Sequence, residues 1–173
     1  MSASPPEVWL RGALPDVPPL LQPVAHSLLQ CREEVDAKLS SLDPAQLVTR
    51  PGGAASVAFH LTHAMGSLDR LLTYARGEQL SDAQLVALRA ESGVEALPLD
   101  AAALAHRFAS AVERALTQVR ATPASELLDS REVGRGRLPS TVIGLLFHAA
   151  EHTQRHVGQA VTTERIVSGM VRE

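Results

Sequence analysis

Five of the seven histidines in this 173-residue chain lie in two segments with helical periodicity. His60 and His63 belong to the first segment, and His148, His152 and His156 belong to the second. Residues four apart project from the same face of a helix, so two of the last three can converge on one divalent ion while a neighbouring helix supplies a third ligand. Three neutral imidazoles leave coordination positions open for water or substrate, which is typical of a catalytic metal site.

A helical wheel narrows the choice of ligands. At about 100° per residue, His152 and His156 lie at the edge of the apolar face of their segment, and His148 is turned further toward solvent. In the other segment His60 lies at the edge and His63 lies one step further out. Periodicity alone therefore slightly favours His60 as the third ligand.

The histidines can also be explained without a metal ion. Neutral imidazoles at the edge of a core can form hydrogen bonds to carboxylates such as Glu151 or Asp69, or to the backbone. His26 and His106 have no partner at helical spacing and are interpreted as structural. The chain has no H-E-x-x-H motif, no glycine-rich phosphate loop, no G-x-S-x-G elbow and no paired Glu-x-x-His motif, so a mononuclear histidine site is the metal chemistry that remains.

The composition predicts helices as the elements that carry these histidines. Hydrophobic residues make up 45% of the chain but aromatic residues only 3%, so small and branched aliphatic side chains must fill the core.

The net charge of −3 with scattered arginines provides no basic face, so we expect no nucleic-acid partner. The single cysteine, Cys31, excludes an internal disulfide, and we expect a cytoplasmic protein. No apolar run approaches the ~18 residues of a membrane span.

The hydrophobic pattern predicts an all-α fold, a four-helix bundle with a short extra helix between its second and third helices. Pro and Gly residues, together with the capping residues Ser56, Ser81, Asp100 and Ser140, mark the boundaries. The four long helices are expected over about 20–42, 56–77, 100–123 and 140–166, the short one over 81–90, and a Gly- and Arg-rich loop over 131–139. Residues 1–19 are expected to form a Pro-rich arm, 20–167 the bundle and 168–173 a tail.

Two segments of the chain resemble the DinB/YfiT-like superfamily. Residues 51–63 read PGGAASVAFHLTH and are followed by DRLL, and residues 147–159 read FHAAEHTQRHVGQ. The likeness extends over about 20–166, and the H-x-x-x-H-x-G-Q ending is its most specific part. The resemblance implies a small four-helix bundle with a mononuclear divalent-metal site.

The resemblance also implies which residues bind the metal. The helix-2 ligand of the family is the seventh residue after the Ser or Thr that starts the helix, which gives His63, and the pair before G-Q gives His152 and His156. Here the resemblance differs from the wheel, and we follow the resemblance. His60, His148 and Arg155 are then neighbours of the site that can contact a substrate or support a ligand. Many members carry a second histidine where this chain has Arg155.

The expected activity follows from the resemblance to the superfamily. This resemblance implies a metal-dependent thiol S-transferase in which Zn²⁺, Ni²⁺ or Fe²⁺ activates a low-molecular-weight thiol against a small-molecule substrate. Two alternatives are a metal-dependent hydrolase, with water in place of the thiol, and a non-catalytic, stress-linked bundle with a structural or vestigial metal site. Many relatives are homodimers, and we expect the same here. Arginines near the last helix can bind carboxylates of a cosubstrate or can be ordinary solvated charges: Arg131, Arg135, Arg137 and Arg155.

Overall fold

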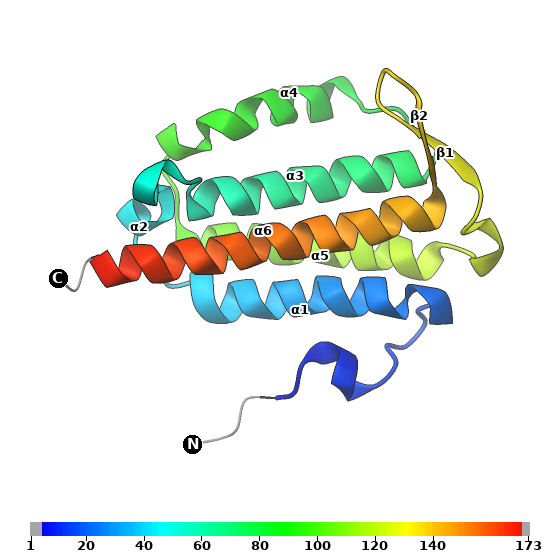
Figure 1. Ribbon diagram of the computed structural model, residues 1–173, viewed down its shortest axis with the longest axis horizontal. Helices are drawn as coiled ribbons and strands as arrows, with labels where there is room; N and C mark the ends of the chain where they lie inside the picture. Colours follow the sequence, from blue (N-terminus) through cyan, green and yellow to red (C-terminus); the bar gives the residue numbers. More distant parts are fainter. Residues whose placement is uncertain (1–4, 171–173) are drawn as a thin grey trace.

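The protein is predominantly helical (Figure 1). The structure is a computed structural model and describes residues 5–170. Its long helices are α1 (Gln22–Leu39), α3 (Val57–Ala75), α5 (Ala101–Ala121) and α6 (Val142–Met170), and its short ones are α2 (Pro44–Val48) and α4 (Asp82–Ala90). Single 3₁₀ turns are η1 (Val8–Arg11), η2 (Pro19–Leu21), η3 (Pro51–Gly53), η4 (Glu91–Ala96) and η5 (Ala124–Glu126).

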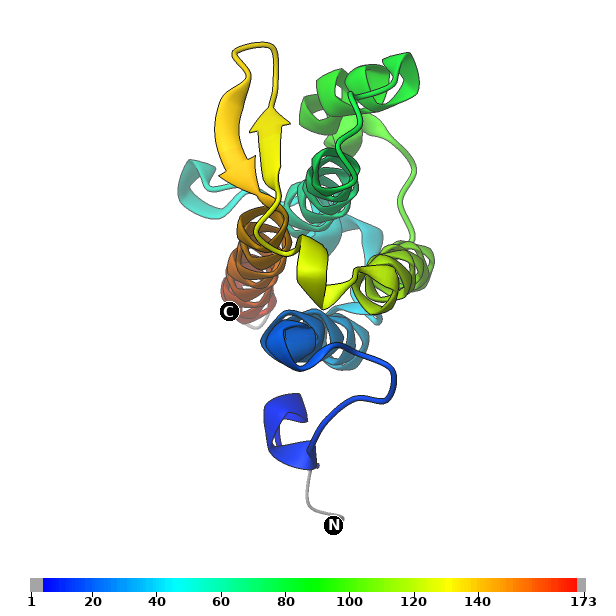
Figure 2. The same ribbon diagram turned by 90° about the vertical axis from the view of Figure 1, so that its right-hand side faces the viewer.

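The four long helices lie side by side around one core. Seen from the end, α3 packs against α6 and α5, and α1 packs against the same two helices (Figure 2). Helices α3 and α6 are in contact along much of their length, which places the two histidine-bearing segments face to face. The short helix α4 lies outside this group, over α3 (Figure 1).

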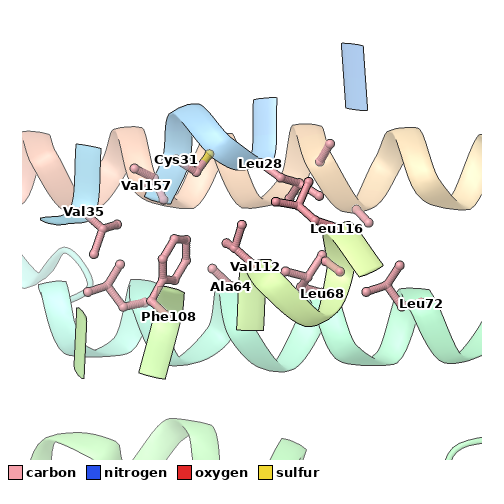
Figure 3. Close-up of a cluster of buried hydrophobic side chains, with 14 of the residues drawn as sticks. Leu28, Cys31, Val35, Ala64, Leu68, Leu72, Phe108, Val112, Leu116 and Val157 are labelled. Carbon is pink, nitrogen blue, oxygen red and sulfur yellow. The ribbon is translucent and has the colours of Figure 1, made fainter. Parts of the chain in front are cut away.

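Aliphatic side chains fill the core, as the composition predicted. Figure 3 shows residues of all four long helices meeting in it: Leu28, Cys31, Val35, Ala64, Leu68, Leu72, Phe108, Val112, Leu116 and Val157. Burial raises the pKa of the Cys31 thiol to about 12. This thiol is therefore an inert core group, as its position on the apolar stripe of α1 indicated.

Local signals in the sequence set most of the helix starts. The hydroxyl oxygen of Ser56 accepts a hydrogen bond from the Phe59 amide at 3.1 Å, and Ser81 forms a capping box with Gln84 at the start of α4. The Asp100 carboxylate accepts from the Ala103 amide at 2.7 Å. These caps are found where the sequence predicted them.

The expected loop over 131–139 is instead a β-hairpin, so the fold is not entirely helical. Strands β1 (Ser130–Val133) and β2 (Leu138–Thr141) pair antiparallel, with Ser130 opposite Thr141. Glycine at 134 adopts a positive φ of 68° in the connecting turn. Ser140 therefore lies in a strand, and Thr141 caps α6, because its hydroxyl oxygen accepts from the Gly144 amide at 3.1 Å.

Other boundaries differ by a few residues. Helix α1 ends at Leu39 rather than near residue 42, because Asp43 forms a capping box with Gln46 and starts the separate helix α2. Helix α6 continues to Met170, beyond the expected end of the bundle at 167. Residues 171–173 of the expected tail lie outside the described residues, as do residues 1–4 of the expected arm.

The described part of the N-terminal arm packs onto α1. Val8 and Val17 are buried, and the Arg11 guanidinium forms an ion pair with Glu33 at 2.7 Å. Within residues 5–170, every helix lacks the combination of length and apolarity that a bilayer span requires.

Candidate metal centre

Three histidines from α3 and α6 converge at the contact between these helices. His63, His152 and His156 each offer one nitrogen, and the three nitrogens lie within 4.8 Å of one another. The Nε2 atoms of His63 and His152 are 3.2 Å apart, and the ring centres of His63 and His156 are 4.6 Å apart. The three rings are neither fully buried nor fully exposed, so solvent reaches the group.

His60, the helix-α3 histidine that the wheel favoured, lies beside this group. Its side chain is buried, one turn before His63. Its Nδ1 is 3.1 Å from Nδ1 of His156. It therefore contacts one member of the group from the side of the core, and His63 is the α3 residue that joins the α6 pair.

Two further residues from the sequence analysis lie on the outer face of α6. The Nδ1 atom of His148 is 2.6 Å from Oε1 of Glu151, and Nη2 of Arg155 donates to Oε2 of the same carboxylate at 2.6 Å. The His148 ring is half exposed, with its centre 5.4 Å from that of His152, and it does not belong to the three-nitrogen group. The side chains of His148 and Arg155 are both about half exposed, so Glu151 fixes them only weakly.

The arginines of the hairpin make other contacts. Nε of Arg131 donates to the Ala75 carbonyl oxygen at 2.8 Å, and Arg137 pairs with Glu132 at 2.5 Å within the hairpin. The hairpin precedes α6, whose first residue is ten positions before His152, or about 15 Å along the helix. Of the four arginines considered from the sequence, Arg155 is the one that lies beside the histidines.

Burial favours the neutral form of three of these imidazoles, those of His60, His152 and His156. It lowers the pKa of His60, of His152 and of His156, and the neighbouring His63 lowers all three further. For His156 the pKa falls to about 4. Unprotonated imidazole nitrogens are the form that binds a metal ion, and the lowered pKa values of His152 and His156 favour this form near neutral pH.

One residue of this centre, Glu91, was not predicted from the sequence. It is the first residue of η4, and its side chain is buried although the preceding helix α4 has no buried residue. Its Oε2 is 2.7 Å from Nδ1 of His63, and its Oε1 accepts from Nη1 of Arg70 at 2.6 Å. Periodicity gives no signal for it, because it follows the predicted end of a short exposed helix.

The residues present fit a divalent metal ion. Three imidazole nitrogens within 4.8 Å of one another are a donor set that Zn²⁺, Ni²⁺ and Fe²⁺ accept. Two imidazole nitrogens only 3.2 Å apart need a proton or a cation between them. In the described part of the chain, Nδ1 of His152 is also a buried nitrogen without a hydrogen-bond partner.

A cavity of about 700 Å³ lies next to His60. It lies between the segment around η3 and helix α6, and Arg155 lines it together with His60, whereas His63, His152 and His156 do not. Gly158 and Gln159, the G-Q of the motif that ends the histidine pair, line it as well. The sequence motif therefore corresponds to a space beside the centre that a small molecule can occupy.

Comparison with known proteins identifies the family. The family model described as the DinB superfamily matches residues 27–160, which is most of the chain. The chain belongs to the DinB superfamily. Among solved structures, this DinB chain is similar to one titled as a conserved protein of a locus from Enterococcus faecalis, with 22% identity, a TM-score of 0.65, and coverage of 86% of this chain and 97% of the other. At that identity the likeness concerns the fold alone. A comparison with curated proteins finds no match.

We expect the metal-free DinB chain to lose stability as the pH falls from about 6.5 to about 4. The pKa of His156 is lowered from 6.5 to about 4 in the folded state, so the unfolded chain takes up this proton first. Protonation then favours unfolding by about 1–2 kcal/mol after allowance for the partial exposure of the ring. Urea unfolding at pH 7.5, 5.5 and 4.5 measures this loss.

His156→Gln is the matched variant, because carboxylates also titrate toward the lower end of this range. The variant should lose less stability than the unmodified chain between pH 7.5 and 4.5. Equal losses in the two proteins would show that His156 does not carry the effect.

Proposed function

We propose that this protein is a metal-dependent enzyme on a four-helix-bundle scaffold, a thiol S-transferase whose divalent ion is held by His63, His152 and His156. The observation that carries the proposal is the convergence of three imidazole nitrogens at a partly exposed contact of α3 and α6, and the neighbouring His60 lines a cavity of about 700 Å³. Membership of the DinB superfamily supports the same reading.

The proposed chemistry needs a nucleophile from outside the chain. A divalent ion, when bound, acts as a Lewis acid that makes a thiol or a water nucleophilic near neutral pH. The only cysteine of the sequence is Cys31, which is buried in the core and whose pKa burial raises to about 12. A small thiol that enters from solvent supplies what the chain lacks.

The chain's own residues orient the ligands and the substrate in this proposal. An imidazole that binds a metal through Nε2 carries its proton on Nδ1, and Nδ1 of His156 faces Nδ1 of His60. Nδ1 of His60 can therefore accept a hydrogen bond from this Nδ1–H and hold the ring of His156. Arg155 lines the cavity and has guanidinium donors left after its bond to Glu151, so it can bind a carboxylate of the thiol or of its acceptor.

Hydrolysis is the second candidate, with water taking the place of the thiol. Partial exposure of the three rings favours it, because water reaches the centre without any cosubstrate. The third reading, a non-catalytic protein with a structural metal, makes a different prediction, since a structural ion raises the melting temperature without turnover.

One set of assays tests these readings. Protein reconstituted separately with Zn²⁺, Ni²⁺ or Fe²⁺ is incubated with a generic electrophile such as monobromobimane and with cysteine, glutathione, bacillithiol or mycothiol. We expect a conjugation rate that exceeds the uncatalysed rate, disappears with a chelator and is absent in His152→Ala.

The other outcomes separate the alternatives. Ester cleavage that needs metal but no thiol would replace the transferase by the hydrolase. A large rise in melting temperature on metal binding, without turnover of either kind, would favour the structural reading.

A further inference from the structure

We propose that Glu91 is a positioning residue of the metal centre, which holds His63 in the tautomer whose Nε2 is free to bind the ion. The inference rests on the proposed function in one respect, because it concerns a ligand of the proposed metal. The contact itself, a buried carboxylate on Nδ1 of a histidine whose Nε2 faces two more imidazoles, is a feature of the metal-free chain.

The hydrogen bond determines where His63 carries its proton. An ionised carboxylate is only an acceptor, so the atom 2.7 Å from Oε2 of Glu91 must be a protonated Nδ1. A neutral imidazole has one proton, and Nε2 is then unprotonated. This Nε2 is the atom 3.2 Å from Nε2 of His152, so the bond aims the free nitrogen at the group.

Arg70 forms a buried ion pair with the carboxylate of Glu91. Glu91 is 6% exposed and the Arg70 side chain only 12%, so both charges are largely removed from water. Nη1 of Arg70 donates to Oε1 at 2.6 Å, which leaves Oε2 for His63. Burying such a pair costs desolvation energy, so the pair adds little to the stability of the fold. Removing one partner would leave the other charge buried and unpaired, so the two side chains stay together.

Gly66 makes room for this pair on α3. A Cβ at this position would overlap Oε1 of Glu91 and would lie 2.8 Å from Nη1 of Arg70. The carboxylate therefore rests directly on the helix backbone, between the turns that carry His63 and Arg70. Gly66 has an ordinary helical conformation, so this close approach is what its missing side chain permits.

The segment between α3 and α5, which comprises α4 and η4, places Glu91 against His63. Within the described residues of α4 and η4, the buried positions are Glu91 and Val94. Gln84 of α4 fastens the segment to α3 through bonds of 2.7 Å to Asp69 and 2.8 Å to Thr73. A segment that buries almost nothing apolar gains little from packing, yet it carries Glu91, whose carboxylate contacts His63.

The test measures the tautomer and the metal affinity separately. In metal-free protein labelled with ¹⁵N-histidine, two-dimensional NMR at pH 8 should show His63 protonated at Nδ1, and Glu91→Ala should shift it toward the Nε2-protonated form. Competition with a chelator should show Co²⁺ binding weakened about 10- to 100-fold in the same variant, with a changed visible spectrum.

Three further variants keep the test decisive. Glu91→Gln should restore part of the affinity, because its amide oxygen can still accept from Nδ1. Gly66→Ala should weaken Co²⁺ binding because its Cβ displaces the Glu91 carboxylate. This variant replaces Glu91→Ala in the test if Glu91→Ala does not fold. Glu95→Gln, on the same turn but bonded to Ser56, should leave the tautomer and the affinity unchanged.

Two results would overturn the role of Glu91: His63 protonated at Nε2 in the unmodified protein, or an unchanged affinity and spectrum in both Glu91→Ala and Gly66→Ala. Failure of the unmodified protein to bind Co²⁺ would instead overturn the proposed function. The tautomer of the metal-free protein would still support or refute the contact in that case.

Discussion

Replacing His63, His152 or His156 by alanine is expected to remove the metal ion from the protein. The unmodified chain should carry about one ion, because these residues offer the three nitrogens within 4.8 Å of one another. Loss of a residue that merely supports a ligand costs about 10- to 100-fold in affinity, so loss of a ligand itself should cost more than about 100-fold. Elemental mass spectrometry on untagged protein, before and after reconstitution, gives the stoichiometry.

His60→Ala and His148→Ala are the matched controls. His148 is exposed and faces Glu151, so its loss should leave the metal content unchanged. His60 contacts His156 without joining the group, and its variant should keep the ion with at most the reduced affinity of a lost supporting residue. An ion kept in His63→Ala but lost in His60→Ala would transfer the ligand role to His60, and no ion in any variant or in the unmodified chain would remove the basis of the proposed function.

Those parts of the fold that depend on local signals could be predicted from the sequence. The starts of α3, α4 and α5 follow from Ser56, Ser81 and Asp100, because a capping side chain bonds to an amide only two or three residues away. The convergence of His152 and His156 is local in the same sense, since residues four apart share a face of one helix.

The choice between His60 and His63 depends on how two helices pack, which a wheel drawn for one helix does not contain. The wheel ranked His60 as nearer the core, and its side chain is indeed the more buried of the two. The three-nitrogen group forms instead at the contact between α3 and α6, one step away from that core face. His63 lies at this contact and retains 25% exposure of its side chain.

Glu91 and the hairpin could not be predicted because both depend on distant contacts. Glu91 becomes part of the centre only when η4 lies against α3 at Gly66, and no periodicity encodes that approach. The hairpin has strands of only four residues, one of which contains Pro139, so its composition was that of a loop. Pairing across the turn at Gly134 is what makes these residues strands.

Phe108→Ala is expected to give the largest loss of stability among single core substitutions, about 3–5 kcal/mol. Its ring is fully buried, and Figure 3 shows it between Val35 of α1 and Ala64 of α3. The surrounding side chains are small aliphatic residues, which cannot expand to fill the space that the ring leaves. Because a domain has only about 5–15 kcal/mol of stability in total, this loss would bring the chain close to unfolding.

Phe147→Ala is the control of identical chemistry, because this ring on α6 is 62% exposed and its loss should change the free energy of unfolding by no more than about 0.5 kcal/mol. Urea unfolding of both variants gives the comparison, and similar losses in the two would refute the packing of Phe108.

The same experiment connects the core to the metal centre. An ion that binds only the folded chain adds about 2.7 kcal/mol at a concentration of 100 Kd, so Zn²⁺ should restore much of what Phe108→Ala removes. Restoration that disappears when His156→Ala is added to Phe108→Ala would show that the ion acts through the three histidines, because the packing defect is the same in both proteins.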